Sequence, residues 1–221
     1  MGDSMNIDST VNNLLNKMHK TGSTEKGKFG ELAVYTICEE IYQQQGGILY
    51  HSYEFITDPE QKGNIKKENG KLYVENLSGF TELDVLLVTK LRVFPIEVKS
   101  YKAKKITFTD DSISGCKVTN KSPIHQNEMH CRHLYSWLFK ALPEGATDYI
   151  VPIVCLADEC EVEDNRSQWQ KEYIKLCVLN NFKQCIEAFN TPLDYQLNLE
   201  SIDKALKEVL VSSSMYLPPR I

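Results

Sequence analysis

Two acids and one lysine lie in an apolar part of the chain, at a spacing that could bring them together. Residues 81–100 read TELDVLLVTKLRVFPIEVKS, a pattern typical of two strands joined by a tight turn. If Lys90 and Leu91 form a two-residue loop, counting outward places Asp84 opposite Glu97. Lys99 then shares the face of Glu97. Two carboxylates at about 5 Å repel each other unless a cation lies between them, so the hairpin predicts a divalent metal.

The turn is the weak point of this hairpin. Lys90 and Leu91 lack the Gly, Asn or Asp that a two-residue loop prefers. A slip of the pairing by one residue would move one acid to the other face of the sheet. The prediction of a shared carboxylate site therefore depends on the register.

Helices are expected on both sides of the hairpin along the chain. Residues 25–45 carry an apolar stripe at helical spacing, with Glu31 in the early turns. Pro123 suits the first turn of a later helix over 123–142, which places Gln126 in that turn. A short amphipathic helix is expected over 9–20.

The remaining segments give a mixed pattern of strands and helices. Residues 148–158 are nearly all apolar, which favours a central strand, whereas Pro152 favours an edge or a strand start. An exposed excursion or hairpin is expected over 58–76, and loops are expected over 110–122 and 161–170. Further strands are expected over 48–56, 104–110 and 174–179, and further helices over 182–189 and 201–211. The predicted fold class is α/β (α+β), with a central mixed β-sheet flanked by helices.

Length and composition fit one domain with decorations. The chain has 221 residues, of which 42% are hydrophobic, enough for one sizeable core. We divide it into an appendage (1–22), a core (23–160) and a C-terminal part that completes or decorates the core (161–221). No apolar run approaches a membrane span and the N-terminus lacks the features of a signal peptide, which predicts a cytoplasmic protein with no membrane partner. Seven cysteines without regular spacing suit a reducing compartment.

The net charge of -5 argues against a nucleic-acid partner, but the distribution of charge is uneven. Between positions 90 and 121 there are eight basic residues and three acids. This strip is either a solvated face or a surface that contacts phosphates. The candidate nucleic-acid-binding residues within it are Lys102, Lys104, Lys105, Lys117 and Lys121.

The order of these motifs resembles the PD-(D/E)xK nuclease superfamily, and within it the nuclease-related domain family, NERD. Four places carry the resemblance: Gly30-Glu31 opening the first long helix, TELDVLLV, FPIEVKS, and SPIHQ at the start of the later helix. Together they span residues 27–139. The resemblance implies a restriction-endonuclease-like core. The sequence departs from the pattern in having Thr81-Glu82-Leu83, and so no proline, before Asp84.

The resemblance also implies roles for individual residues. Asp84 and Glu97, with the Val98 carbonyl and Glu31, would bind Mg²⁺ or Mn²⁺. Lys99 would orient or activate a water, or stabilise charge in the transition state. Gln126 would position the substrate or a water. The expected activity is metal-dependent hydrolysis of phosphodiester bonds, with DNA expected before RNA.

Other interpretations stay open at this point. His125, His130, Cys131 and His133, with Cys116, are metal-ligand types, but their spacing suits a structural zinc site poorly. A cysteine nucleophile paired with one of these histidines would need a third, orienting group. The same fold could also serve as a non-catalytic nucleic-acid-binding or protein-interaction module, or as an assembly subunit. Residues 145–221 lie outside the resemblance and are candidates for specificity or dimerisation, so a homodimer is left open.

Overall fold

The computed structural model describes residues 23–57, 65–68, 71–74, 79–116 and 122–220. The short helix expected over 9–20 lies outside these residues, as do Lys117 and Lys121. The helices are α2 (Ser23–Gln45), α3 (Pro123–Leu138), α4 (Gln168–Tyr173), α5 (Phe182–Phe189) and α6 (Leu199–Val209), with 3-10 turns η3 (Pro143–Gly145), η4 (Thr147–Tyr149) and η5 (Leu179–Asn181). The strands are β1 (Gly47–Ile56), β2 (Ile65–Glu68), β3 (Lys71–Val74), β4 (Phe80–Val88), β5 (Val93–Lys99), β6 (Lys105–Phe108), β7 (Ile113–Ser114), β8 (Ile153–Leu156), β9 (Glu161–Asp164), β10 (Lys175–Val178), β11 (Leu210–Ser212) and β12 (Met215–Arg220).

A mixed sheet forms the centre of the molecule, as the sequence predicts. Within the described residues it has seven strands in the order β10-β8-β5-β4-β1-β11, and β12 also pairs with β1. The pairs β10–β8 and β8–β5 are parallel, whereas β5–β4 and β4–β1 are antiparallel. Strands β10, β11 and β12, which come from the C-terminal part of the chain, therefore belong to the same sheet as the central hairpin.

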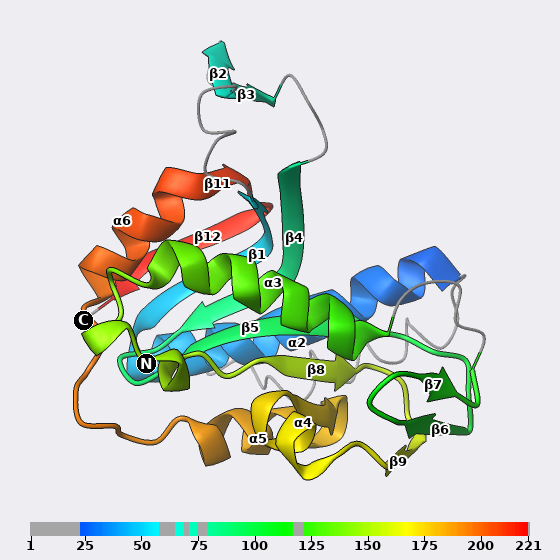
Figure 1. The fold of residues 1–221 in the computed structure, drawn as a ribbon. Coiled ribbons are helices and arrows are strands. Elements are labelled where there is room, and N and C mark those ends of the chain that lie inside the picture. The colour runs from blue at the N-terminus through cyan, green and yellow to red at the C-terminus, as the bar shows by residue number, and fades with distance from the viewer. Residues whose placement is uncertain (1–22, 58–64, 69–70, 75–78, 117–121, 221) are drawn as a thin grey trace, which may run out of the picture.

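Helices cover both faces of this sheet (Figure 1). Because side chains alternate along a strand, Val85 and Leu87 of β4 pack with α2 and α5 on one face. Leu86 and Val88 pack with α3 and α6 on the other. The predicted α+β fold is confirmed. No helix in the described part of the chain is both long enough and apolar enough to cross a membrane.

The β4–β5 hairpin has the predicted register. Val85 pairs with Ile96 and Val88 with Val93, so continuing the count places Asp84 opposite Glu97. The loop holds this register without a glycine because Thr89 supplies a side-chain acceptor. Its Oγ1 accepts hydrogen bonds from the backbone N–H groups of Leu91 (3.1 Å) and Arg92 (3.0 Å). The expected weakness of the turn is therefore offset by one hydroxyl.

The conflict over residues 148–158 is resolved by where β8 begins. Pro152 comes directly before the first residue of β8, and β8 lies between β5 and β10 in the interior of the sheet. The register also places Pro95 of β5 beside Pro152, and neither has an N–H to donate. Asn127 of α3 compensates, because its Nδ2 donates to the carbonyls of Pro95 (3.3 Å) and Ile153 (2.8 Å). These two bonds anchor α3 to the sheet.

Several elements differ from expectation. The loop expected over 110–122 contains β7, and the loop expected over 161–170 contains β9 and the start of α4. Strand β9 is short and polar, so the sequence has no apolar pattern there that would indicate a strand. It pairs with β6 in a small separate sheet. The last helix ends at Val209, and β11 and β12 follow it. Strand β12 contains Pro218 and Pro219, which argue against a strand except at a sheet edge.

The segment 58–76 includes the antiparallel hairpin β2–β3, one of the two forms expected for it. Figure 1 shows this hairpin projecting away from the main sheet, beyond the start of β4.

Candidate active site

The two central acids meet where β4 and β5 part. The recorded pairs between these strands end at Val85–Ile96, while β5 continues beside β8 to Lys99. In the next position Asp84 and Glu97 face each other on the α3 side of the sheet. A gap therefore opens between the strands at the acid pair.

Asp84 fills part of this gap with its own carboxylate. The Val98 N–H, which has lost its partner in β4, donates to Asp84 Oδ2 at 2.6 Å. On the other edge of β5, the Lys99 carbonyl accepts from the Ala157 N–H at 2.8 Å, toward β8. Because successive carbonyls along a strand point to opposite edges, the Val98 carbonyl faces the gap together with Asp84.

Glu97 is fully buried, and its two carboxylate oxygens face different neighbours. Its Oε1 forms an ion pair with Lys99 Nζ. Its Oε2 lies 3.5 Å from His130 Nδ1 and, within the described residues, has no hydrogen-bond partner. A buried carboxylate oxygen without a partner is costly, so it favours a cation or a donor at this position.

The electrostatics of the site follow from this crowding. Burial, and then the Glu97 carboxylate, raise the pKa of Asp84 well above its usual range, against the pull of Lys99. Burial alone would lower the pKa of Lys99, but Glu97 and Asp84 outweigh it and leave that pKa raised. Lys99 is therefore protonated at neutral pH, whereas burial and the Glu97 carboxylate disfavour the ionised form of Asp84.

Glu31 reaches the same site from α2, which covers the opposite face of the sheet. Burial, followed by the carboxylate of Glu82, raises the pKa of Glu31, and Lys99 and Glu97 also act on it. Glu31 thus belongs to the electrostatic field of the acid pair. Glu82, the additional acid next to the motif, is exposed.

Helix α3 supplies the remaining wall. Gln126 lies in its first turn, as predicted, and His130 lies one turn later on the same face. Both line a cavity of about 550 Å³ together with Phe80, Thr81 and Met129. The sequence suggested His130 as a zinc ligand or as a partner of a cysteine nucleophile, and its place beside Glu97 was missed. The helical repeat from Gln126 to position 130 was the available signal.

The residues present fit a magnesium-type site with a partial protein shell. In the described part of the chain, no group of three or more His, Cys, Asp and Glu side chains forms a metal cluster. Mg²⁺, however, is usually held by one or two carboxylates and completes its shell with waters and phosphate oxygens. Asp84, Glu97 and the Val98 carbonyl match that pattern, and the unpartnered Glu97 Oε2 supports it.

The structure does not assemble the alternative zinc set. His130 faces Glu97, whereas Cys131 is buried and donates to Asn127 Oδ1 at 3.6 Å. Burial raises the pKa of the Cys131 thiol well above its usual range, which disfavours a thiolate nucleophile.

The predicted basic strip is partly neutralised. Lys102 and Lys104 are exposed. Lys105 is also exposed, but its Nζ lies 3.1 Å from Glu163 and 3.6 Å from Glu161, both on β9. These two ion pairs reduce the positive charge that Lys105 offers to a phosphate. Lys117 and Lys121 lie outside the described residues.

Comparison with known proteins gives one family. The family model described as "Nuclease-related domain" matches residues 26–157, more than half of the chain, and this span includes all of the site residues above. No curated protein matches the chain. The crystal structure of protein VC1899 from Vibrio cholerae is similar at 11% identity over 91% of this chain and 58% of that one, with a TM-score of 0.29. That likeness is too weak to say anything about this chain.

Proposed function

Because the chain belongs to the nuclease-related domain family, we propose that it is a metal-dependent nuclease that hydrolyses phosphodiester bonds, with DNA expected as the substrate before RNA. The observation that carries the proposal is the acid pair at the end of the β4–β5 ladder, where the half-buried Asp84 faces the fully buried Glu97 and Lys99 lies beside them. Two carboxylates that face each other, one of them fully buried, cost stability unless a cation joins them. A structural role would be served better by apolar residues, such as those from Val85 to Val88 in β4.

Each polar group has a task in such a reaction. Asp84, Glu97 and the Val98 carbonyl would hold Mg²⁺ or Mn²⁺, which when bound polarises the phosphate and makes water a better nucleophile. Lys99 stays protonated beside Glu97, so it would orient the attacking water or stabilise the charge that develops on the phosphate oxygens.

Two groups lie farther from the acid pair along the chain. Glu31, whose raised pKa keeps it closer to neutral, would accept a hydrogen bond from water near the metal or take up a proton. Gln126 is neutral and faces the cavity, and it would position the substrate strand or a water.

The test is a cleavage assay on the purified full-length chain. Single-stranded and double-stranded DNA and RNA are incubated with Mg²⁺, with Mn²⁺ and with EDTA. Wild type should cut at least one substrate only when metal is present. Asp84→Ala and Lys99→Ala should each lower the rate by at least about a hundredfold, with folding checked by circular dichroism.

Two results would count against the proposal. If metal-dependent cutting survived in both variants, the activity would belong to another site or to a contaminant. If wild type cut none of the four substrates but bound one of them, a non-catalytic nucleic-acid-binding module would be the better description.

A further inference from the structure

The cavity beside Glu97 has a chemistry that the proposed cleavage does not need. We propose that it holds an unpaired nucleobase of the substrate, so that the protein acts on a strand whose nucleotide next to the cleaved phosphate is unstacked. This inference rests on the proposed nuclease function and names its substrate class.

The residues that line this cavity differ in chemistry from the acid pair beside it. Phe80 and Met129 offer an aromatic ring and a thioether, and Thr81, Gln126 and His125 offer hydrogen-bonding groups. Among the described residues that line it there is no Asp, Glu, Lys or Arg. A phosphate would call for fixed positive charge, whereas a nucleobase has two apolar faces and a polar edge.

Size and exposure agree with a base as the occupant. The cavity of about 550 Å³ falls within the range of small-molecule sites, about 300–1,000 Å³. Met129 is a large apolar residue left 37% exposed on α3. A flexible thioether next to a ring can cover a flat ligand from one side.

One residue, His130, connects the cavity to the acid pair. Gln126 and His130 line the cavity, and His130 Nδ1 lies 3.5 Å from Glu97 Oε2. A base held by α3 would therefore leave the phosphate of its own nucleotide, or of the next one, near Asp84 and Glu97. Because bases inside a duplex are stacked and paired, such a pocket is filled by single-stranded substrate or by a flipped nucleotide.

Binding to matched strands tests this inference on the full chain. The probes are a fluorescent single-stranded DNA and a strand of equal length whose bases are replaced by abasic sites, with Ca²⁺ in place of Mg²⁺ to slow cleavage. Both carry the same phosphates, so only the bases differ. Wild type should bind the base-containing strand about tenfold more tightly.

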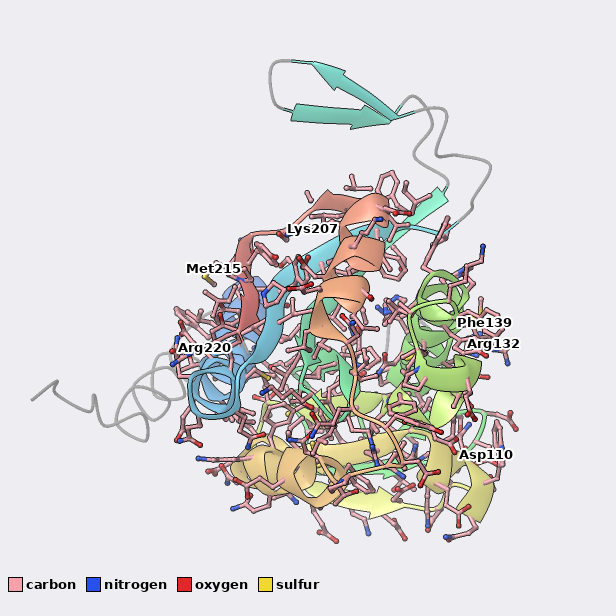
Figure 2. All side chains as sticks on the ribbon, turned by 90° about the vertical axis from the view of Figure 1, so that its left-hand side faces the viewer. Asp110, Arg132, Phe139, Lys207, Met215 and Arg220 are labelled. Carbon is pink, nitrogen blue, oxygen red and sulfur yellow. The ribbon has the colours of Figure 1, made fainter. Side chains whose placement is uncertain are left out.

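The variants locate that preference. Met129→Ala and Phe80→Ala should each reduce the base preference several-fold while binding of the abasic strand is unchanged. Met215→Ala is the matched control, because Met215 is 38% exposed and lies on the opposite side of the molecule from α3 (Figure 2). Equal binding of the two strands by wild type, or an unchanged preference in both variants, would overturn the inference.

A second measurement does not depend on folding of the variants. A strand carrying 5-iodouracil should crosslink under ultraviolet light to the peptide containing residues 123–138, and crosslinks confined to other peptides would contradict the proposal. Cleavage measured in parallel separates the two ideas. If both strands were cut at equal rates, the nuclease proposal would be supported and the base pocket would be rejected. If the protein bound the base-containing strand more tightly but cut neither strand, the base pocket would be supported and the nuclease proposal would be rejected.

Discussion

The hydroxyl oxygen of Thr89 accepts a hydrogen bond from the backbone N–H of Arg92 at 3.0 Å, and this contact closes the turn that sets the register of the acid pair. The Thr89 N–H in turn donates to the Arg92 carbonyl at 2.8 Å. Thr89 Oγ1 also donates to Asn190 Oδ1 at 2.7 Å, which ties the turn to the residue after α5. A side chain thus supplies what the Lys90-Leu91 loop lacks.

Replacing this hydroxyl should weaken the hairpin. Thr89→Val keeps the shape of the side chain but leaves the N–H groups of Leu91 and Arg92 without their acceptor. We expect a loss of about 1–3 kcal/mol in the free energy of unfolding, measured in urea. Thr109→Val is the control, because Thr109 Oγ1 makes the same kind of bond to the Ser112 N–H in the exposed β6–β7 turn. Equal losses in the two variants would contradict a special role for Thr89.

Removing one charge of the acid pair should stabilise the metal-free protein. Asp84→Asn keeps an oxygen that can accept from the Val98 N–H but ends the repulsion from Glu97. In EDTA at neutral pH we expect the free energy of unfolding to rise by about 1 kcal/mol. The exposed Asp111→Asn should change little.

The same pair of variants tests metal binding. Addition of Mg²⁺ should raise the melting temperature of wild type and of Asp111→Asn, because a ligand of the folded state stabilises it. Asp84→Asn should gain much less. An equal gain in all three proteins would place the ion elsewhere.

Asn127 should be as important for the site as for the fold. Asn127→Ala removes the donor to the carbonyls of Pro95 and Ile153, next to the two prolines that cannot complete the ladder. We expect a loss of about 2–3 kcal/mol and, because α3 carries Gln126 and His130, a lower cleavage rate even where the protein remains folded. Asn180→Ala, at an exposed asparagine, should leave both quantities unchanged.

A pH dependence is expected from an ion pair away from the site. Arg166 is buried and makes two bonds of 2.8 Å to the carboxylate of Asp164. Burial acts to raise the pKa of Asp164, but the bonds and charge of Arg166 outweigh it and lower that pKa. The pair therefore contributes stability above the ordinary pKa of about 4, and the contribution is lost as the pH falls through the lowered value.

Asp164→Asn should remove this contribution. Since Asp164 is only half-buried, we expect a loss of about 2 kcal/mol at neutral pH, below the 3–5 kcal/mol of a fully buried pair. Urea unfolding across acidic and neutral pH is the measurement. The difference from wild type should shrink toward the acid limit, and a constant difference at every pH would be inconsistent with the pair. Metal-dependent cleavage should survive.

The amino-acid sequence by itself determined the local features of the site. The acids Asp84 and Glu97 stand at equal distances from the Lys90-Leu91 turn, and the period of two along a strand fixes their common face. Pro123 marks the start of α3 and so places Gln126 in its first turn. These relationships join residues that are near one another in the chain, so counting suffices to find them.

Only the tertiary structure decided how these local features meet. The parting of β4 and β5 beyond Val85–Ile96, the placement of His130 against Glu97 and the approach of Glu31 from α2 depend on packing between distant segments. Strand β12 likewise exists because residues on either side of Pro218 and Pro219 pair with β1, with a register shift across the two prolines. Propensity and periodicity describe contiguous residues, whereas these contacts are set by which surfaces the whole chain can bury together.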